Sequence, residues 1–256
     1  MVKAKSPAVA LQLYTVRNEV EADYPGTLKK VARMGYPAVQ AGPTKKYDAK
    51  AVRRMMDDLD LDSAGVHVGM DQLEKEFNAT VDMVKDLRDE WAIVAWMPED
   101  RRKTAAQWRA TARTMTRLGA KLKKEGVRLA YHNHSFEFYP FGGRYGYDIF
   151  FDTVDPDLVQ TEIDTYWVRH GNEDPVAYLK KHAGHIQIVH FKDMGKGPDR
   201  PMVPVGEGIL DWPAIIAACK KGGTRWVCVE QDTCDPLTPL QAAKVSIENC
   251  RRWGLV

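Results

Sequence analysis

Short apolar runs rich in β-branched residues alternate with longer amphipathic stretches along the whole chain. The apolar runs predict strands at residues 9–16, 38–42, 64–69, 92–97, 127–132, 159–164, 186–191 and 226–230. The stretches between them predict helices at residues 24–34, 48–59, 70–88, 105–124, near 146–154, 175–182, 212–220 and 238–252. Asp48, Thr104, Asp174 and Asp211 stand where helix N-caps are expected. The chain therefore reads as a repeated strand–helix alternation.

This alternation predicts one closed barrel. Strands joined by helices run parallel, and eight such units in about 250 residues have the size of a (β/α)8 barrel. An open doubly wound sheet is the alternative, but the turn after its first strand is typically rich in glycine, and here the sequence is YTVRNEV. No segment resembles a linker. We therefore predict an α/β fold, a (β/α)8 TIM barrel, with a single domain over residues 1–256.

Composition and charge narrow the class of protein. Lys and Arg number 37 and Asp and Glu 35, giving a net charge of +2 without any charge block, which argues against nucleic acid or an anionic membrane as a partner. No apolar run approaches the ~18 residues of a membrane span. The start of the chain lacks the apolar core of a signal peptide, so we expect a cytoplasmic protein. The four cysteines form no CxxC pair and are expected to be reduced, mostly buried thiols.

Polar and aromatic side chains gather where the predicted strands end. In a (β/α)8 barrel the carboxyl ends of all strands face one shared mouth. Four of the seven histidines stand at such ends, together with carboxylates, a lysine and aromatic residues. The complete set is Tyr14, Arg17, Gln40, His67, Trp96, His132, His134, Glu137, Asp164, His190, Lys192 and Glu230. The sequence therefore predicts a functional site at the mouth.

A metal site is the interpretation that best explains the carboxylates in this set. Asp164 and Glu230 directly follow apolar runs, where a bare charge is too costly to bury. With His190 they come from three neighbouring strands, and the fifth strand offers a fourth ligand, either Glu137 or His132. Carboxylate and imidazole ligands without cysteine suit Mn²⁺, Mg²⁺, Co²⁺, Fe²⁺ or Zn²⁺ and argue against a structural zinc site.

Other residues near the mouth are candidates for substrate contact. Lys192 is expected either to hold an oxyanion of the substrate or to pair with Asp193. His170 is a further candidate, whereas His182 and His185 precede the seventh strand at the opposite face and are expected to be structural. Several aromatic residues either roof the barrel or form platforms for a sugar ring, namely Tyr14, Trp96, Phe136, Tyr139 and Trp167. Tyr139 and Trp167 also hint at a homodimer or higher homo-oligomer.

Five motifs in order resemble one known family. YHNHSFEF (131–138), EIDTYW (162–167), HFKDM (190–194), VGEGILDW (205–212) and VEQD (229–232) are similar to the sugar phosphate isomerase/epimerase family of xylose isomerase-like TIM barrels. The resemblance implies a divalent metal held by a Glu beside strand five, an Asp on strand six, a His on strand seven and a Glu on strand eight. Asp164, His190 and Glu230 match the last three directly.

The fourth ligand is where this chain departs from the pattern. Ketose epimerases of the family end strand five with a glutamate, and the residue at that position here is His132. His132 precedes Asp164 by 164 − 132 = 32 residues, whereas Glu137 precedes it by 164 − 137 = 27. Either Glu137 folds back onto the metal, which is the assignment we adopt, or His132 replaces the carboxylate.

The resemblance also implies a reaction. A metal ion, expected to be Mn²⁺, would polarise a carbonyl of a sugar or keto-sugar while carboxylates move the neighbouring proton, with Glu230 and Glu137 as the acid–base pair and His132 as a proton shuttle. Arg17, His67, Trp96, His134, Trp167 and Lys192 are the expected substrate contacts. The predicted function is therefore a metal-dependent sugar isomerase or epimerase.

Three other functions compete with this prediction. A keto-sugar or inosose lyase or dehydratase begins with the same proton abstraction. An enzyme of the endonuclease IV type needs more metal ligands and a basic surface, which the balanced charge does not provide. A non-catalytic sugar-binding barrel would not need the three matching ligands.

Overall fold

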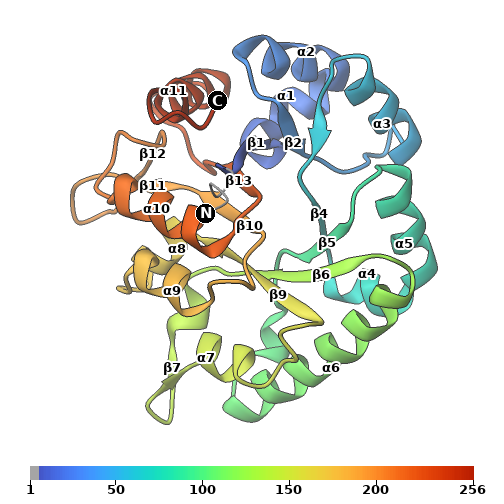
Figure 1. Ribbon diagram of the computed structural model, residues 1–256, viewed down its shortest axis with the longest axis vertical. Helices are drawn as coiled ribbons and strands as arrows, with labels where there is room; N and C mark the ends of the chain where they lie inside the picture. The colour runs from blue at the N-terminus through green and yellow to red at the C-terminus, as the bar shows by residue number, and fades with distance from the viewer. Residues whose placement is uncertain (1–5) are drawn as a thin grey trace, which may run out of the picture.

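The computed structural model describes residues 6–256 and contains a closed barrel of parallel strands (Figure 1). In sheet order the strands are β3 (Asp62–Ser63), β2 (Ala38–Gln40), β1 (Ala8–Gln12), β13 (Trp226–Val229), β10 (Ile188–Phe191), β9 (Val159–Asp164), β6 (Arg128–His132), β5 (Trp91–Val94) and β4 (Val66–Val68). Because β3 and β4 are joined directly through residues 64–65, they are two halves of one barrel strand. The ring therefore closes with eight strand positions, and the predicted (β/α)8 fold is confirmed.

The interruption of the third barrel strand lies at Gly65. Its φ of +97° takes the backbone into a region that favours glycine, and its N–H donates to Asp89 Oδ2 at 2.6 Å. A Cβ at this position would lie 2.5 Å from Ile93 Cδ1. Of the run predicted as a strand at 64–69, residues 66–68 form β4, while β3 lies just before the run and pairs with a different neighbour.

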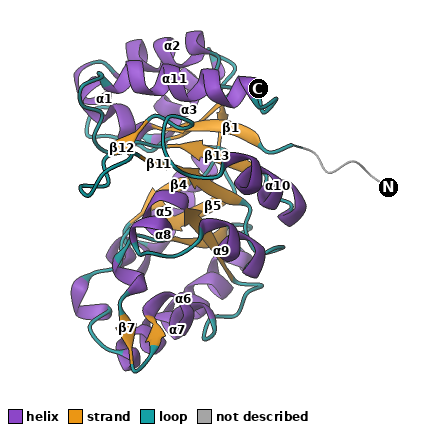
Figure 2. Ribbon diagram, turned by 90° about the vertical axis from the view of Figure 1, so that its left-hand side faces the viewer, coloured by secondary structure: helices purple, strands orange, loops and turns teal. Residues whose placement is uncertain are grey.

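The helices form a ring outside the strands, as Figures 1 and 2 show. They are α1 (Arg17–Ala22), α2 (Tyr24–Met34), α3 (Ala49–Asp57), α4 (Met70–Lys75), α5 (Phe77–Asp86), α6 (Ala105–Lys124), α7 (Gly146–Phe151), α8 (Thr165–His170), α9 (Pro175–Lys181), α10 (Trp212–Gly222) and α11 (Pro239–Arg252). In both views α11 lies beside α2, so the last helix packs next to the beginning of the ring.

Sequence signals located most helices but not all of them. The four predicted caps each accept a backbone N–H with the side chain of Asp48, Thr104, Asp174 or Asp211. The helix predicted at 70–88 is divided into α4 and α5, because the backbone at Glu76 leaves the helical region (φ −125°, ψ 38°). Helices α1 and α8 were not predicted, and neither were the short hairpins β7 (Pro140–Phe141) with β8 (Arg144–Tyr145) and β11 (Asp193–Met194) with β12 (Met202–Val203).

The interior of the barrel changes from apolar to polar along its strands. Alternate residues of each strand point inward. Near the start of the strands the inward side chains form an apolar cluster of Ala10, Ala38, Ala64, Trp91, Ile93, Ala130, Ile188, Trp226 and Cys228. Two residues further along four of these strands stand Gln40, His132, His190 and Glu230. The closed, apolar end therefore supports a polar end at the mouth.

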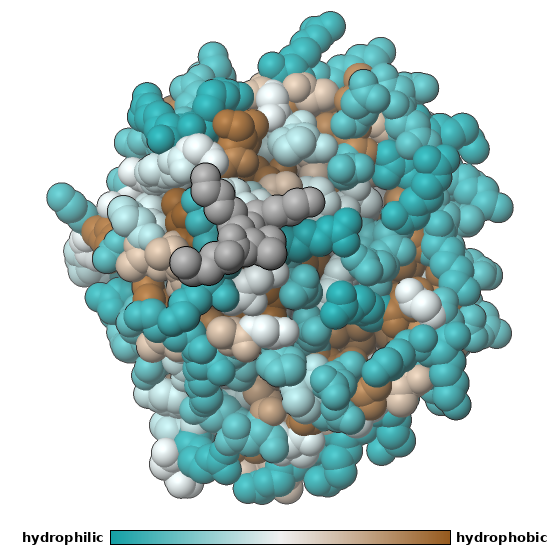
Figure 3. All heavy atoms as spheres, viewed as in Figure 1, coloured by the Kyte–Doolittle hydropathy of each residue, from teal (hydrophilic) through white to brown (hydrophobic). Residues whose placement is uncertain are grey.

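Among the described residues, the face of the molecule drawn in Figure 3 has no large apolar patch, because hydrophilic side chains dominate it and hydrophobic atoms are scattered.

Within residues 6–256 no helix is both long and apolar enough to cross a membrane. All four cysteines are buried thiols, as predicted.

Candidate metal centre

Four side chains at the mouth converge closely enough to hold one ion. They are His132 at the end of β6, Asp164 at the end of β9, His190 on β10 and Glu230 just after β13, and all four are buried. One potential ligand atom from each lies within 4.8 Å of the others. Strands β6, β9, β10 and β13 are consecutive neighbours in the sheet. Three of the predicted ligands, Asp164, His190 and Glu230, are therefore brought together.

Glu137 does not join this group. It lies in a short 3-10 helix (Phe136–Phe138) beyond β6, where one carboxylate oxygen accepts from the hydroxyl of Tyr131 and the other from the backbone N–H of His134 at 2.9 Å. Burial raises the pKa of Glu137 to about 8. Both oxygens are thus engaged away from the cluster, and the residue of this segment that lies with Asp164, His190 and Glu230 is His132, not Glu137.

Asp164 presents an oxygen into the cluster that the protein leaves unused. Its Oδ1 accepts from the backbone N–H of Trp167 at 2.9 Å and so caps α8. Its Oδ2 is buried and finds no hydrogen-bond partner among the described residues, while His132 Nε2 lies 3.9 Å from it. Burial raises the pKa of Asp164 to about 7, against the attraction of Lys192. An orphaned buried acceptor of this kind fits a cation ligand.

The Lys192 ammonium lies against the same carboxylates. Its Nζ is 3.6 Å from Asp164 Oδ2, 3.1 Å from Glu230 Oε2 and 2.7 Å from Asp232 Oδ2. Burial alone would lower the pKa of Lys192, but these three carboxylates outweigh it and raise the pKa. Lys192 was expected to contact an oxyanion or pair with Asp193; its observed partners are Glu230 and Asp232, and Asp232 was not predicted.

The remaining residues of the cluster shift one another's pKa values. Burial opposes ionisation of Glu230, yet Lys192 and His190 hold its pKa well below the usual range. Burial would lower the pKa of His190, but Glu162 and Glu230 raise it to about 10. The pKa of His132 is lowered by burial to about 4, so this imidazole is neutral near pH 7. Two carboxylates and two imidazoles form a donor set suited to several divalent ions.

A second carboxylate, Glu162, lies two residues before Asp164 on β9 and was missed in the sequence. It is fully buried and accepts from Gln40 Nε2 at 2.8 Å and from nitrogens of three histidines. The sequence contained a signal for this placement, because alternate residues of a strand share one face, so Glu162 points inward as Asp164 does. Glu162, His67, His132 and His190 also form a second group whose ligand atoms lie close together.

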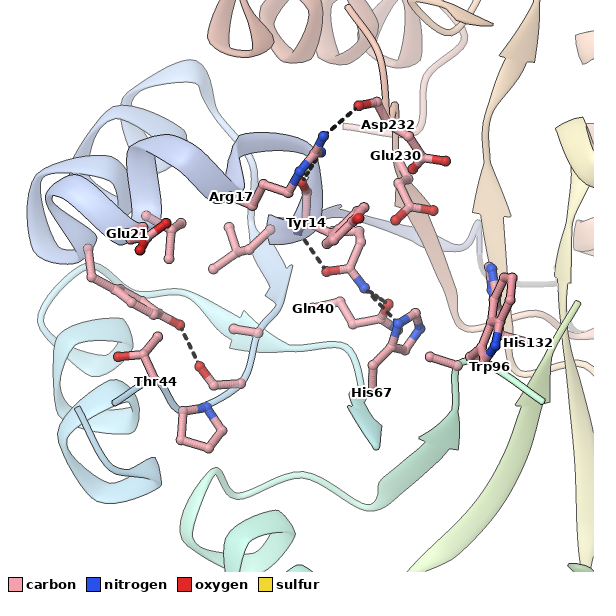
Figure 4. Close-up of a pocket in the computed structure, with 18 of the residues that line it drawn as sticks. Tyr14, Arg17, Glu21, Gln40, Thr44, His67, Trp96, His132, Glu230 and Asp232 are labelled. Atoms are coloured by element: carbon pink, nitrogen blue, oxygen red, sulfur yellow. Dashed lines mark hydrogen bonds between the residues drawn. The ribbon is translucent and has the colours of Figure 1, made fainter. Parts of the chain in front are cut away.

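A cavity of about 930 Å³ opens beside the cluster (Figure 4). Its wall includes Glu230 and His132 of the cluster and all six predicted substrate contacts, which are Arg17, His67, Trp96, His134, Trp167 and Lys192. It extends away from the cluster along the loops after β1 and β2, where Tyr14 and Thr44 line it. The predicted substrate residues therefore share one cavity with the cluster.

Aromatic residues form part of this wall. Tyr14 and Trp96 are about half exposed, at 52% and 51%, and both line the cavity. The ring of Trp96 packs edge-on against His134 and Phe136. Burial lowers the pKa of His134 to about 2, so its ring is neutral. These rings are placed where the face of a sugar ring could pack against them.

Other predicted residues lie outside the cavity wall. Tyr139 is 65% exposed. His170 packs against the rings of Tyr166 and Trp167. His182 packs against Tyr147 and Phe151, in keeping with a structural role. Homodimer formation stays a prediction.

Comparison with known proteins identifies the fold family. A family model described as "Xylose isomerase-like TIM barrel" matches residues 28–253. An inosose dehydratase of Geobacillus kaustophilus is 26% identical over 189 residues, which are 65% of this chain and 61% of the dehydratase. The chain thus spans about three fifths of the length of this relative.

Solved structures agree with the architecture. A sugar phosphate isomerase/epimerase from Parabacteroides distasonis superposes with a TM-score of 0.85 at 22% identity, covering 100% of this chain and 97% of the other. The IolI protein, crystallised with a bound zinc atom, gives a TM-score of 0.75 at 18% identity and covers 96% of this chain and 97% of its own. At these identities the similarity establishes the fold.

Proposed function

Because the chain belongs to the xylose isomerase-like TIM barrel family, we propose that it is a divalent-metal-dependent enzyme that removes the proton next to the carbonyl of a keto-sugar or keto-polyol. One observation carries the proposal: the unpartnered Asp164 Oδ2 is buried in a group with His132, His190 and Glu230, and two of that group, His132 and Glu230, line a cavity of about 930 Å³. The absence of a partner for this oxygen holds for the part of the chain that the structure describes.

The residues of the cluster fit a metal ion. His132 through Nε2, Asp164 through Oδ2, His190 through Nδ1 and Glu230 through Oε2 would hold it. Nitrogen and oxygen ligands together suit Mn²⁺, the ion we propose, and also Fe²⁺, Co²⁺ or Zn²⁺; the IolI relative binds zinc. When bound, such an ion supplies Lewis-acid polarisation of a substrate carbonyl.

Glu230 is the proposed base. Its carboxylate lines the cavity, and its low pKa keeps it ionised at neutral pH. Lys192 donates to it at 3.1 Å and also lines the cavity. A charged ammonium beside the base can donate a hydrogen bond to a developing oxyanion or give a proton to a departing hydroxyl group. Asp232 holds Lys192 in that position.

This arrangement favours a lyase or dehydratase. An epimerase built as first expected would use Glu230 and Glu137 as its proton-transfer pair, but Glu137 is engaged by Tyr131 and the His134 backbone. The group next to Glu230 is instead a proton donor, Lys192, which suits loss of a hydroxyl from the neighbouring carbon. The named activity of the inosose dehydratase relative supports the same reaction class.

A sugar isomerase or epimerase is the second candidate. His67 and His134 line the same cavity, and the His134 imidazole is neutral. A neutral imidazole could take part in returning a proton to the substrate carbon. Both candidates share the first step, so they are separated by product and not by proton exchange.

The test is a panel of free, phosphorylated and 3-keto sugars and a keto-inositol, incubated in D₂O with protein and Mn²⁺ or Zn²⁺. NMR reads exchange of the α-proton, and mass spectrometry reads loss of water. We expect exchange with wild type and a loss of about 10²–10⁴-fold in Glu230→Gln. Dehydrated product supports the lyase, and epimerised product alone supports the second candidate.

The metal assignment is tested on the same preparations. His132→Asn should weaken binding of Mn²⁺ measured by calorimetry, whereas Glu137→Gln should leave it within about twofold. The reverse result would restore Glu137 as the fourth ligand. A wild-type protein that binds no divalent ion would overturn the proposed function.

A further inference from the structure

The carboxylate of Glu162 is a common acceptor for three imidazoles. Its Oε2 lies 2.8 Å from His67 Nε2, 3.0 Å from His132 Nδ1 and 3.2 Å from His190 Nε2. Its Oε1 accepts from Gln40 Nε2 at 2.8 Å. A carboxylate oxygen is a hydrogen-bond acceptor, so each of the three ring nitrogens facing it must carry a hydrogen.

This requirement fixes which nitrogen of His132 is free and which nitrogen of His190 faces the cluster. With hydrogen on Nδ1, His132 presents Nε2 toward Asp164 Oδ2. With hydrogen on Nε2, His190 presents Nδ1 toward Glu230 Oε2, 2.9 Å away. Gln40 Oε1, 2.8 Å from His190 Nε2, is a second acceptor on the same side and demands the same hydrogen. His132 Nε2 is thus the nitrogen without a hydrogen, whereas His190 Nδ1 also faces a carboxylate and would bind a metal after giving up its hydrogen.

Glu162 could instead be read as a ligand itself, because it forms a close group with the three histidines. The geometry argues against that role. The three nitrogens converge on one carboxylate oxygen at hydrogen-bond distances, which leaves no space between them for an ion. Neither Glu162 oxygen is unsatisfied within residues 6–256, whereas Asp164 Oδ2 is. Glu162 therefore stands behind the ligands.

We propose that Glu162 is a positioning residue that orients the rings of His132 and His190 for metal binding and sets the tautomers of His132 and of the cavity-lining His67. The inference rests on the proposed function for its metal, but the hydrogen-bond pattern exists without it. Ligand histidines in general donate their second N–H to an acceptor of this kind. What is particular here is that one buried carboxylate serves two ligands and a cavity-lining histidine together.

The third imidazole, that of His67, faces the cavity in which a substrate would bind. With Nε2–H donated to Glu162, His67 turns Nδ1 toward Gln12 Nε2 at 3.4 Å, a long contact. The His67 side chain is 23% exposed and lines the cavity. Its Nδ1 is therefore a fixed acceptor, suited to a substrate hydroxyl.

The direct test measures tautomers in the metal-free wild type. Imidazole ¹⁵N NMR should show one tautomer each, with hydrogen on Nδ1 of His132 and on Nε2 of His67. Because His190 also faces Glu230, hydrogen on its Nε2 is expected whether or not its Nδ1 is protonated. Tautomer mixtures at His67 and His132 would overturn the inference even if the protein binds metal and turns over substrate.

The variant test uses Glu162→Gln with Glu137→Gln as the matched control, since both replace a buried glutamate. Calorimetry with Mn²⁺ should show a 10–100-fold weaker affinity for Glu162→Gln at an unchanged stoichiometry of one, and an unchanged affinity for Glu137→Gln. ¹⁵N spectra of Glu162→Gln with Zn²⁺ should show loss of the single His67 tautomer.

Each other outcome has a distinct meaning. Unchanged affinity and unchanged tautomers in Glu162→Gln would overturn the inference. Complete loss of binding in Glu162→Gln, with binding retained in Asp164→Asn, would make Glu162 a ligand and also overturn it. If wild type binds no ion, the proposed function fails, and the tautomers of the metal-free protein still decide the role of Glu162. If Glu162→Gln does not fold, those wild-type spectra decide it alone.

Discussion

Glu162 and Asp164 stand two residues apart on β9, both fully buried inside the barrel, and their surroundings are opposite. Both oxygens of Glu162 accept hydrogen bonds from imidazole or amide groups. Burial would raise the pKa of Glu162, but the charges of His190 and His67 and the hydrogen bond from His132 hold it well below the usual range. Asp164 keeps one oxygen unpartnered within residues 6–256, and burial raises its pKa to about 7. The protein thus supplies hydrogen-bond donors to both oxygens of Glu162 but leaves one oxygen of Asp164 without a donor.

The largest expected effect is on metal affinity when Asp164, the carboxylate with an unpartnered oxygen, is replaced. Asp164→Asn keeps an oxygen that can cap α8 at Trp167 but removes the charge and a strong ligand. We expect Mn²⁺ affinity, measured by calorimetry, to fall about 1,000-fold, or about 4 kcal/mol, which exceeds the effect expected for Glu162→Gln. An affinity within tenfold of wild type would show that the ion is held elsewhere.

The next largest effect is on the free energy of unfolding when Glu162, the fully hydrogen-bonded carboxylate, is replaced. Glu162→Leu removes the shared acceptor of His67, His132 and His190 and leaves the buried His132 Nδ1–H unpaired, and breaking a buried pair of this kind costs about 3–5 kcal/mol. Urea unfolding in excess EDTA should therefore show a free energy of unfolding lower by that amount. A loss below about 1 kcal/mol would mean that the hydrogen bonds to Glu162 contribute little to the fold.

Glu137 sharpens the comparison as a third buried carboxylate, and its pKa is about 8 in the fold against about 4.3 in the unfolded chain. The unfolded chain therefore loses the proton first as pH rises, and wild-type stability falls by about 1.4 kcal/mol per pH unit between these values. Gln at this position resembles the protonated acid. The stability of wild type relative to Glu137→Gln should thus fall by about 3 kcal/mol from pH 5.5 to 7.5 in urea unfolding, and a constant difference would contradict the buried, protonated state.

The smallest effect is the stability of Asp164→Asn without metal. An orphaned carboxylate contributes little to folding, and the cap on α8 is retained, so the free energy of unfolding in EDTA should stay within about 1 kcal/mol of wild type. This variant is also the control for Glu162→Leu. A drop as large as that of Glu162→Leu would mean that the attraction between Asp164 and Lys192 stabilises the empty site.

The sequence predicted the fold well because the relevant signals are local. The α6 range matches its prediction in full, owing to the Thr104 cap and a long amphipathic pattern. The β9 range also matches its prediction at both ends. The divided third strand was missed because the break depends on close packing of Gly65 against Ile93, which links residues from two strands. Helix α8 was missed because Asp164 both ends a strand and caps the following helix.

The site was predicted in part for the same reason. Asp164, His190 and Glu230 could be found because strand ends share one mouth. The choice between His132 and Glu137 could not be made, since it depends on the Tyr131 hydroxyl, which holds Glu137 away from the cluster. Glu162 was visible in the alternation of β9, but its role depends on three histidines that come from other strands.

The two ends of the large cavity come from different parts of the gene. Every proposed metal ligand lies between residues 132 and 230, whereas the far wall is formed by the loops after β1 and β2 in the first fifth of the chain. Selection can therefore alter which molecule is admitted while the ion, the base and their supporting histidines remain untouched. Exchanging residues 41–47 between homologues offers a direct way to redirect such a barrel to a new compound without rebuilding its chemistry.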